Sequence, residues 1–440
     1  MMQPWFKKAK LGIFIHWGLY AVEGVHESWS MALGKMSCEE YYKQKENFTA
    51  EKYDPKEWAK YFKAAGANYV VLTTKHHEGF CLFDTEFTDL NVVKATPCGK
   101  DLIGPYADAL REQGIKVGLY FTNTDWADDD HMRVILDKTQ AEIDQLRKEK
   151  VNFKSIFDTT KYPASEETKE ELDGCWQRFM TRYKGEIREI MTKYKPDILW
   201  TDVMVRRPGF DWECAAVKKM ITDINPTTIV NGRLGDQGDY STPECYIPLR
   251  SLDSDWELCT TMNDSWGYQG HDHNYKDIHK LVRIFVECIS KGGNLLLSFG
   301  PDRTGAMQDE VKEILTKMGE WTSKYAEAIY PTNAGLDPAY FLGGSTLTDD
   351  KETLYLFVFD CSHGQIMLNG IRNKIKRITS LKNGQELTHR KYGGAGWVNM
   401  PGFRWIDLPA EAIDDICTVI KVEFEGPIDI VDIDHQKALT

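Results

Sequence analysis

Short apolar runs alternate with helical patterns over the first three quarters of the chain. The apolar runs predict strands at 11–15, 68–74, 115–121, 197–201, 227–231 and 294–299. The amphipathic stretches predict helices at 55–64, 101–113, 172–193, 215–224, 275–290 and 311–325. This alternation is typical of βα units and a parallel sheet. Because no Gly-x-Gly-x-x-Gly follows the first strand, the pattern favours an α/β fold with a (β/α)8-like barrel over a dinucleotide-binding sheet.

The pattern changes near Pro331. Beyond it lie short alternating runs at 353–359, 365–368, 375–381, 403–408 and 417–424. Turn signals such as Asn369-Gly and Asn383-Gly separate these runs, which predicts a β-sandwich. We therefore divide the chain into a barrel domain at 1–333 and a C-terminal β-sandwich domain at 334–440. The highly charged stretch 128–171 predicts a helical or looped excursion from the barrel.

The chain has 440 residues and a formal net charge of −13. This charge argues against nucleic acid and anionic membranes as partners, because both are negatively charged. No apolar run reaches the roughly 20 residues that a membrane-spanning helix needs. Residues 1–10 carry lysines before only a short apolar strand, which is not the pattern of a signal peptide. We expect a cytoplasmic protein, or a periplasmic or secreted one if a leader has been removed.

Polar and aromatic residues follow nearly every predicted strand. In a barrel, the C-terminal ends of the strands meet at one rim, and catalytic residues lie there. The residues at or after these ends include His16, Trp17, His76, His77, Asp125, Trp126, Trp200, Asp202, Asn231, Arg233, Glu244, Glu257 and Trp266. Their recurrence predicts a single pocket with polar and aromatic walls.

This mixture of side chains suits a sugar. Tryptophan faces stack on the C–H face of a pyranose, while His, Asp, Glu and Arg hydrogen-bond its hydroxyls. Two carboxylates can then break the glycosidic bond, one by attacking the anomeric carbon and the other by protonating the leaving oxygen. Asp202 is the strongest candidate, because burying a carboxylate at the end of an apolar strand is costly without a function. Such a reaction needs no cofactor.

Histidine pairs leave a metal site as a minor alternative. His76 and His77 are adjacent at a strand end, where neighbouring side chains diverge, and no third ligand has the needed spacing. His271 and His273 lie in a polar stretch before a helix, which favours a solvated loop. We therefore predict no metal, while a metal-dependent hydrolase built on His16, His76 and His77 stays open.

Four motifs occur in order along the chain. They are Lys8-Ala-Lys-Leu-Gly-Ile-Phe-Ile-His-Trp-Gly18, Lys75-His-His-Glu-Gly-Phe80, Trp200-Thr-Asp202 and Gly292-Gly-Asn-Leu-Leu-Leu297. Together they resemble glycoside hydrolase family 29, the α-L-fucosidases. The resemblance spans about residues 5 to 330, and the β region follows where this family carries a C-terminal sandwich.

The resemblance implies a retaining mechanism with Asp202 as the nucleophile. It implies that His16, His76 and His77 hold sugar hydroxyls, that Trp200 lines the pocket and that Arg233 lies close to the carboxylates. Trp266, in Ser-Trp-Gly-Tyr, resembles a further wall. We add Trp29 and Trp126 as candidate substrate contacts, although packing at the barrel rim is an alternative for Trp126.

The acid/base has two candidates, because its position in the sequence varies across the family. Glu244, in Asp239-Tyr-Ser-Thr-Pro-Glu244, is similar to one version of the site, and we favour it. Glu257, in Trp256-Glu257, is similar to another. A retaining pair of carboxyl groups is expected ~5–5.5 Å apart.

Several departures from the family pattern bear on the substrate. Val203 follows Asp202 where the family usually has Gly. The usual Glu-Trp pair is interrupted as Glu27-Ser28-Trp29, and Ser298 stands where Asn is more usual. Arg206 and Arg207 follow the nucleophile strand, where they are either solvated or bind a sulfate or carboxylate.

We therefore expect an exo-enzyme that releases terminal α-L-fucose from an oligosaccharide or polysaccharide. An exo-α-L-galactosidase on the same scaffold is the alternative, because an apolar slot rejects an added hydroxyl only ~10²-fold. Its substrate would be L-galactose, either unsulfated or as the 6-sulfated L-galactose of algal galactans. A non-catalytic carbohydrate-binding protein is the second alternative. The loops at 128–171 and 206–211 are expected to set linkage and leaving group. The C-terminal domain either buttresses the barrel, which we favour, or binds polysaccharide. The oligomeric state stays open.

Overall fold

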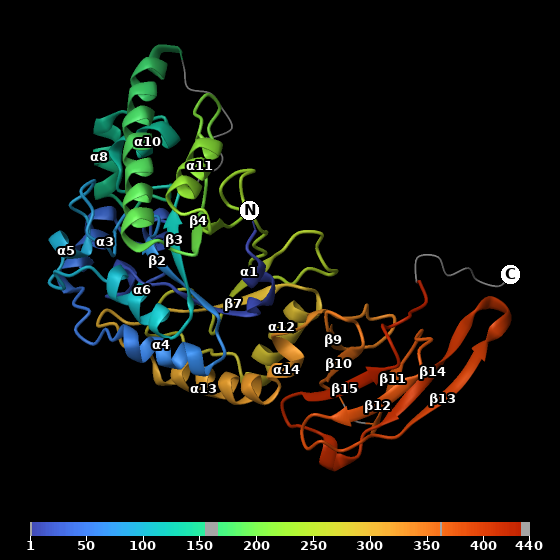
Figure 1. The fold of residues 1–440 in the computed structure, drawn as a ribbon. Coiled ribbons are helices and arrows are strands. Elements are labelled where there is room, and N and C mark those ends of the chain that lie inside the picture. Colours follow the sequence, from blue (N-terminus) through green and yellow to red (C-terminus); the bar gives the residue numbers. More distant parts are fainter. Residues whose placement is uncertain (1, 155–165, 361–362, 433–440) are drawn as a thin grey trace.

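The computed structural model describes residues 2–154, 166–360 and 363–432. Its largest sheet contains parallel strands only, in the order β5-β4-β3-β2-β1-β7-β6. The strands are β1 (Leu11–Ile15), β2 (Tyr69–Lys75), β3 (Lys116–Thr122), β4 (Ile198–Asp202), β5 (Ile229–Val230), β6 (Glu257–Thr261) and β7 (Asn294–Phe299). Figure 1 shows this curved sheet with helices along its outer face. The α/β part of the predicted fold is confirmed.

An irregular segment stands where the predicted barrel would have its eighth strand. Residues 239–245 make single parallel bridges, Asn231 to Tyr240 on the β5 side and Glu244 to Cys259 on the β6 side. A further bridge joins Ser241 to Trp256. The two edge strands are therefore linked through this segment and not by direct pairing.

Helices cover the outer face of the sheet, and their caps follow from the sequence. The side chain of Asp54 accepts hydrogen bonds from the first backbone N–H groups of α4, whose first residue is a proline. The covering helices are α4 (Pro55–Ala64), α6 (Ile103–Glu112), α10 (Glu166–Tyr194), α11 (Cys214–Ile224), α12 (Ile278–Ser290) and α13 (Asp309–Lys324). The shorter helices are α1 (Pro4–Ala9), α2 (Trp29–Ala32), α3 (Cys38–Lys43), α5 (Val92–Ala95) and α14 (Ala326–Ile329).

The charged excursion is helical where the structure describes it. It contains α7 (Asp129–Leu136), α8 (Gln140–Lys148) and the start of α10, which packs against α7. Residues 155–165 lie outside the described residues.

Aromatic side chains fill the inside of the curved sheet. Phe6 of α1 lies against the rings of Tyr69 and Tyr240, which closes the end opposite the rim. Gly12 is required in β1, because a Cβ atom there would lie 2.3 Å from the ring of Tyr69. Phe14 belongs to the next layer up, towards the rim. The rim residues therefore stand on a packed floor, not on an open channel.

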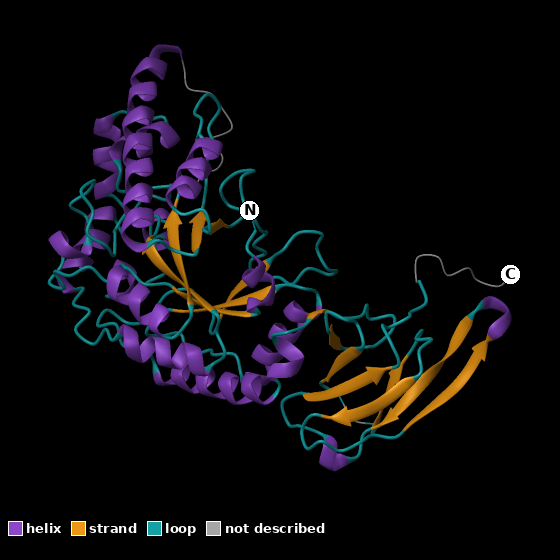
Figure 2. Cartoon of the chain, viewed as in Figure 1, coloured by secondary structure: helices purple, strands orange, loops and turns teal. Residues whose placement is uncertain are grey.

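Two antiparallel sheets form the C-terminal part, as predicted. One has the order β12-β15-β10-β9-β8 and the other β11-β14-β13. The strands are β8 (Asn333–Ala334), β9 (Gly344–Leu347), β10 (Thr353–Val358), β11 (Gln365–Leu368), β12 (Ile375–Ser380), β13 (His389–Ala395), β14 (Met400–Asp407) and β15 (Thr418–Phe424). Side chains of both sheets, including Leu356, Leu368, Ile406 and Ile420, share one core. Figure 2 shows β13 and β14 as a long hairpin that projects from it.

The larger C-terminal sheet also packs against the barrel helices. Tyr355, Phe357 and Val419 point away from the sandwich core and belong to the barrel's own apolar cluster. The ring of Phe357 lies 6.2 Å from that of Trp321 in α13. Since this face is buried by the barrel, the contacts favour the buttressing role expected for the C-terminal domain.

Cutting the chain after residue 333 is expected to destabilise the barrel, because it exposes Trp321 and the apolar surface around it. Residues 1–333 alone should unfold at a lower temperature than the full chain or aggregate. Calorimetry of the full chain should show a single transition. A shortened chain that unfolds at the unchanged temperature would contradict this coupling.

Candidate active site

A cavity of about 200 Å³ opens at the C-terminal ends of the parallel strands. It is smaller than the ~300–1,000 Å³ pockets that hold drug-sized ligands, which suits one sugar ring. The predicted site residues that line it are His16, Trp29, His76, His77, Trp200, Asp202, Arg233, Glu244 and Trp266. The structure therefore brings together residues more than 200 positions apart in the sequence.

One guanidinium group joins the two favoured carboxylates. Arg233 donates from Nη1 to Asp202 Oδ1 at 2.6 Å and from Nη2 to Glu244 Oε2 at 2.6 Å. Its Nε atom donates to Thr242 Oγ1 at 3.2 Å, which fixes the plane of the group. Asp202 is 13% exposed and Glu244 is 44% exposed, so one carboxylate is enclosed and the other faces the opening.

Asp202 is held in its charged form. Burial alone would raise its pKa, but the charge of Arg233 and the hydrogen bond that Arg233 donates outweigh burial and lower the pKa of Asp202 to about 2. The hydroxyl of Tyr120 donates to Asp202 Oδ2 at 2.9 Å. Both carboxylate oxygens are therefore oriented by fixed donors, and the group is ionised at neutral pH.

Three histidines present their rings to the cavity from fixed positions. The Nδ1 atom of each ring is hydrogen-bonded to a hydroxyl oxygen. The partners are Ser298 for His16 at 2.9 Å, Ser28 for His76 at 2.5 Å and Thr122 for His77 at 2.7 Å. Burial lowers the pKa of His16 and His77 well below the usual value, so both are neutral. A neutral ring has one donor and one acceptor nitrogen, which suits sugar hydroxyls.

Aromatic rings form the floor. Tyr120 stacks on Trp200 at 5.6 Å and on His76 at 5.5 Å. Phe14 packs on Trp200 at 5.0 Å, and the Arg233 guanidinium lies 4.6 Å above the Trp200 ring. The floor therefore helps to hold Arg233 in place by a cation–π contact.

Trp126 and Glu257 do not line the cavity. Trp126 is buried behind the wall, 5.3 Å from Trp29 and 5.2 Å from His77. Glu257 begins β6, at the end of the strand away from the rim, and accepts a hydrogen bond from Trp200 Nε1 at 2.9 Å. Its side chain is buried, and burial raises the pKa of Glu257 to about 7.

Three lining residues, Phe14, Tyr120 and Cys259, were missed by reasoning from sequence. Glu27 and Val203, which the sequence showed only as departures from the family pattern, also line the cavity. Phe14 and Tyr120 lie inside predicted strands, one layer below the rim, so a search of strand ends passes over them. Two-residue alternation along the strands would have found them, because His16 and Asp202 point to the same side as Phe14 and Trp200.

Comparison with known proteins agrees with this geometry. The sequence profile described as Alpha-L-fucosidase matches residues 1–327. The chain belongs to the α-L-fucosidase family. It is 31% identical to the tissue α-L-fucosidase of Rattus norvegicus over 355 residues, which cover 74% of this chain and 69% of that protein. The family assignment makes the chain a glycosidase and confirms the resemblance to glycoside hydrolase family 29.

Solved structures of the family share the fold. The α-L-fucosidase isoenzyme 1 of Paenibacillus thiaminolyticus superposes with a TM-score of 0.80 and 32% identity, over 96% of this chain and 98% of that one. A Thermotoga maritima α-fucosidase solved in complex with fucose superposes with a TM-score of 0.72 and 27% identity, over 95% and 96% of the two chains. Both matches extend through the C-terminal sheets.

The structure shows where the departures of this chain from the family pattern lie. Despite the inserted Ser28, Glu27 and Trp29 both line the cavity, and Ser28 itself contacts His76. Ser298 supplies the partner of His16. These two departures keep polar partners at the site.

Val203 is the most unusual of the departures. Its φ of 41° lies in the left-handed region, where a β-branched residue is strained by roughly 1–3 kcal/mol. A glycine, which is usual there in the family, adopts this conformation without strain. The Val203 side chain lines the cavity beside Asp202, so a strained residue forms part of the cavity wall.

Behind the histidines lies a buried ion-pair network. Lys75 contacts Glu186 at 2.6 Å and Asp125 at 3.1 Å, and Arg182 of α10 contacts both carboxylates. Burial opposes the charge on Asp125, but Lys75 and Arg182 outweigh it and hold the pKa of Asp125 well below its usual range. Gly79 must lack a side chain, because a Cβ atom would lie 2.3 Å from Asp125. The network anchors the strand end that carries His76 and His77.

No metal site is apparent in the parts of the chain that the structure describes, where no group of three His, Cys, Asp or Glu residues could hold an ion. Over the same residues, none of the helices has the length and apolar character needed to cross a bilayer.

Replacing Lys75 with methionine is expected to lower the free energy of unfolding by about 3–5 kcal/mol, because two buried carboxylates then share Arg182 alone. Since the pKa of Asp125 is depressed, its contribution is present above the unfolded-state value of about 3.9 and is lost as the pH falls below it. Urea unfolding at pH 7 and at lower pH measures both effects. Lys169→Met, which removes an exposed pair with Asp173 at 2.7 Å, is the control and should change little. Equal losses in the two variants would contradict the network's importance.

Proposed function

We propose that this enzyme is a retaining exo-α-L-fucosidase that releases terminal α-L-fucose by double displacement. The observation that carries the proposal is that Asp202 and Glu244 are held on one guanidinium at a cavity the size of a single sugar. The cavity is closed below by Phe14, Tyr120 and Trp200. A floor of this kind leaves room for the end of a glycan but not for its continuation.

In the first step, an Asp202 oxygen attacks the anomeric carbon and the bond to the leaving oxygen breaks. Glu244 gives its proton to that oxygen, so the leaving group departs as an alcohol. In the second step, Glu244 takes a proton from water, the water oxygen attacks the anomeric carbon, and the bond to Asp202 breaks. The low pKa of Asp202 keeps the nucleophile ionised before attack.

Arg233 holds both carboxylates in place. Its contact with Asp202 stabilises the negative charge that the nucleophile needs. Glu244 is the more exposed of the two, so it faces the opening through which a leaving group would depart.

Neutral sugar is favoured over a sulfated one. Among the described lining residues, Arg233 is the sole lysine or arginine, and both of its terminal nitrogens are bound to carboxylates. A sulfate on C6 would therefore find no free cation. Unsulfated α-L-galactose remains the alternative substrate. A non-catalytic binding protein is disfavoured, because binding alone does not require a charged carboxylate below the sugar.

An aryl α-L-fucoside is expected to be hydrolysed faster than the matching aryl α-L-galactoside. Asp202→Asn should lower kcat/KM by about 10⁴-fold or more while leaving the fold intact, because the nucleophile is lost. Release of the aryl group and circular dichroism measure the two properties. Faster galactoside turnover would establish the alternative substrate, and unchanged activity in the variant would refute Asp202 as nucleophile.

Glu244→Gln is expected to lower kcat/KM by about 10²–10⁴-fold for a fucoside with a poor leaving group, because protonation of the leaving oxygen is lost. Glu257→Gln is the matched control and should lose far less, since Glu257 does not line the cavity. Rates for aryl fucosides of increasing leaving-group pKa measure the difference. The opposite ranking of the two variants would make Glu257 the acid/base.

A further inference from the structure

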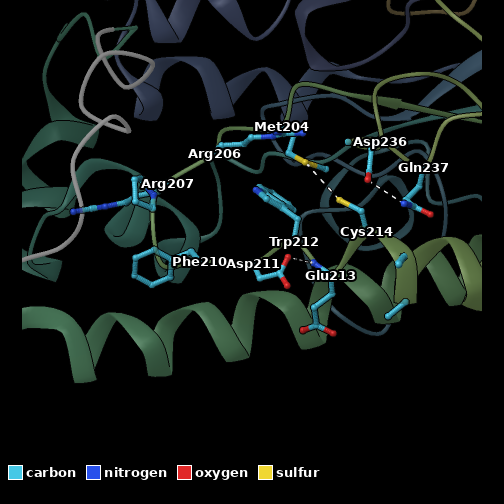
Figure 3. A pocket seen from close by; sticks show the side chains of 14 residues that line it. Met204, Arg206, Arg207, Phe210, Asp211, Trp212, Glu213, Cys214, Asp236 and Gln237 are labelled. Atoms are coloured by element: carbon cyan, nitrogen blue, oxygen red, sulfur yellow. Dashed lines mark hydrogen bonds between the residues drawn. The ribbon is translucent and has the colours of Figure 1, made fainter.

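A second and larger cavity, of about 990 Å³, lies beside the catalytic one. Figure 3 shows its walls, which come from the loop after β4 and the loop after β5. Met204 and Arg206 lie on the first wall, and Asp236 and Gln237 on the second. Nothing in the proposed reaction at Asp202 uses these residues.

The chain itself connects the two cavities. Met204 comes two residues after Asp202, and Gly235 comes two residues after Arg233. Since consecutive Cα atoms are ~3.8 Å apart, each of these wall residues has its Cα within about 8 Å of that of a catalytic residue. Glu244 follows Gln237 by seven residues and is bound by the same Arg233.

Another groove also adjoins the catalytic cavity, but it is reached from different wall residues. Its walls include Val25, His26, Lys35 and Gln269, and its volume is about 750 Å³. Val25 and His26 precede Glu27, and Gln269 follows Trp266 by three residues, so this groove adjoins two other walls of the catalytic cavity. Asp202 and Glu244 are bound instead by Arg233, which is two residues from Gly235 of the larger cavity. The larger cavity is therefore the better placed of the two to receive a group that leaves from Glu244.

The lining of the larger cavity suits a neutral sugar. Met204, Phe210 and Trp212 offer apolar surface, while Arg206, Asp236 and Gln237 offer donors and acceptors for hydroxyls. Asp236 and Gln237 already bond to each other at 2.9 Å, as the dashed line in Figure 3 marks.

Charge argues against an anionic occupant. Arg207 is buried, pairs with Asp137 at 2.8 Å and donates to the Val134 carbonyl, so its charge is already used inside the protein. Glu213 is likewise paired, with Lys184 at 3.0 Å. Among the described lining residues, the charged groups that remain are one cation, Arg206, and two carboxylates, Asp211 and Asp236. A sulfated or uronic leaving group would be repelled.

We propose that this cavity binds the leaving-group side of the substrate, as one or more neutral sugar residues next to the fucose. Arg206, Asp236 and Gln237 would bind their hydroxyls, and the apolar wall would hold their C–H faces. This inference rests on the proposed function, because it requires that bond cleavage takes place between Asp202 and Glu244. On this proposal, the loops after β4 and β5 determine which leaving groups the enzyme prefers.

The test compares kcat/KM for 4-nitrophenyl α-L-fucoside, which lacks a sugar leaving group, with that for 2′-fucosyllactose and 3-fucosyllactose. Arg206→Ala and Gln237→Ala should each lower kcat/KM for at least one trisaccharide about tenfold more than for the aryl fucoside. The use of two variants, at the exposed Arg206 and the half-buried Gln237, guards against a folding defect in either one. Lys35→Ala, in the other groove, is the control and should affect all three substrates equally.

Equal loss on all three substrates in the Arg206 and Gln237 variants would overturn the proposal, as would a selective loss in Lys35→Ala. Failure of the unmodified enzyme to hydrolyse either trisaccharide would also overturn it. The proposed function is judged separately, because an enzyme that turns over the aryl fucoside through Asp202 keeps that function even if the cavity assignment fails.

Discussion

A single buried cation is the constraint on which the site depends. Asp202 lies above an aromatic floor, where an isolated carboxylate would take up a proton to escape the cost of burial. Arg233, whose Nη1 atom lies 2.6 Å from Asp202 Oδ1, prevents this protonation. Arg233 is in turn supported by Thr242 and by the ring of Trp200. Thr242 and Trp200 therefore act on the nucleophile through Arg233, by holding the cation that keeps Asp202 ionised, and Trp200 does so in addition to lining the cavity.

The scaffold separates the positions that must be rigid from those that select the substrate. The histidines are fixed by hydroxyls and by the buried pairs of Lys75, all of which lie on or behind regular strands. The larger cavity is formed by loops, which tolerate changes in sequence without disturbing the strands. The C-terminal sheets add stability from outside, through Phe357 and its neighbours, and contribute nothing to the catalytic cavity.

Buried parallel strands could be predicted because they are continuous apolar runs, and the runs at 11–15 and 294–299 match β1 and β7 residue for residue. Strand β6 (Glu257–Thr261) was missed because polar residues interrupt its apolar ones, and β13 because most of its residues are exposed. Most candidate site residues converge because they follow strands. Glu257 lies elsewhere because it begins a strand, and the sequence alone does not tell whether a polar residue begins a strand or ends one. Trp126 follows a strand but lies behind the wall, where it packs against Trp29, His77 and Phe153, and such packing is not visible in the sequence.

The irregular segment at 239–245 gives the two carboxylates unequal freedom. Asp202 ends a strand that is paired along its length with β3, and its carbonyl accepts a bond from Asn123 at 2.7 Å. Glu244 is attached through one bridge to Cys259 and is followed by Cys245 with a φ of 57°. In the proposed reaction the nucleophile returns to the same carbon, whereas the acid/base serves first the leaving oxygen and then a water molecule. The backbone thus holds the nucleophile Asp202 firmly and the acid/base Glu244 less firmly. Glu244 is also the group that acts on two different oxygen atoms during each turnover.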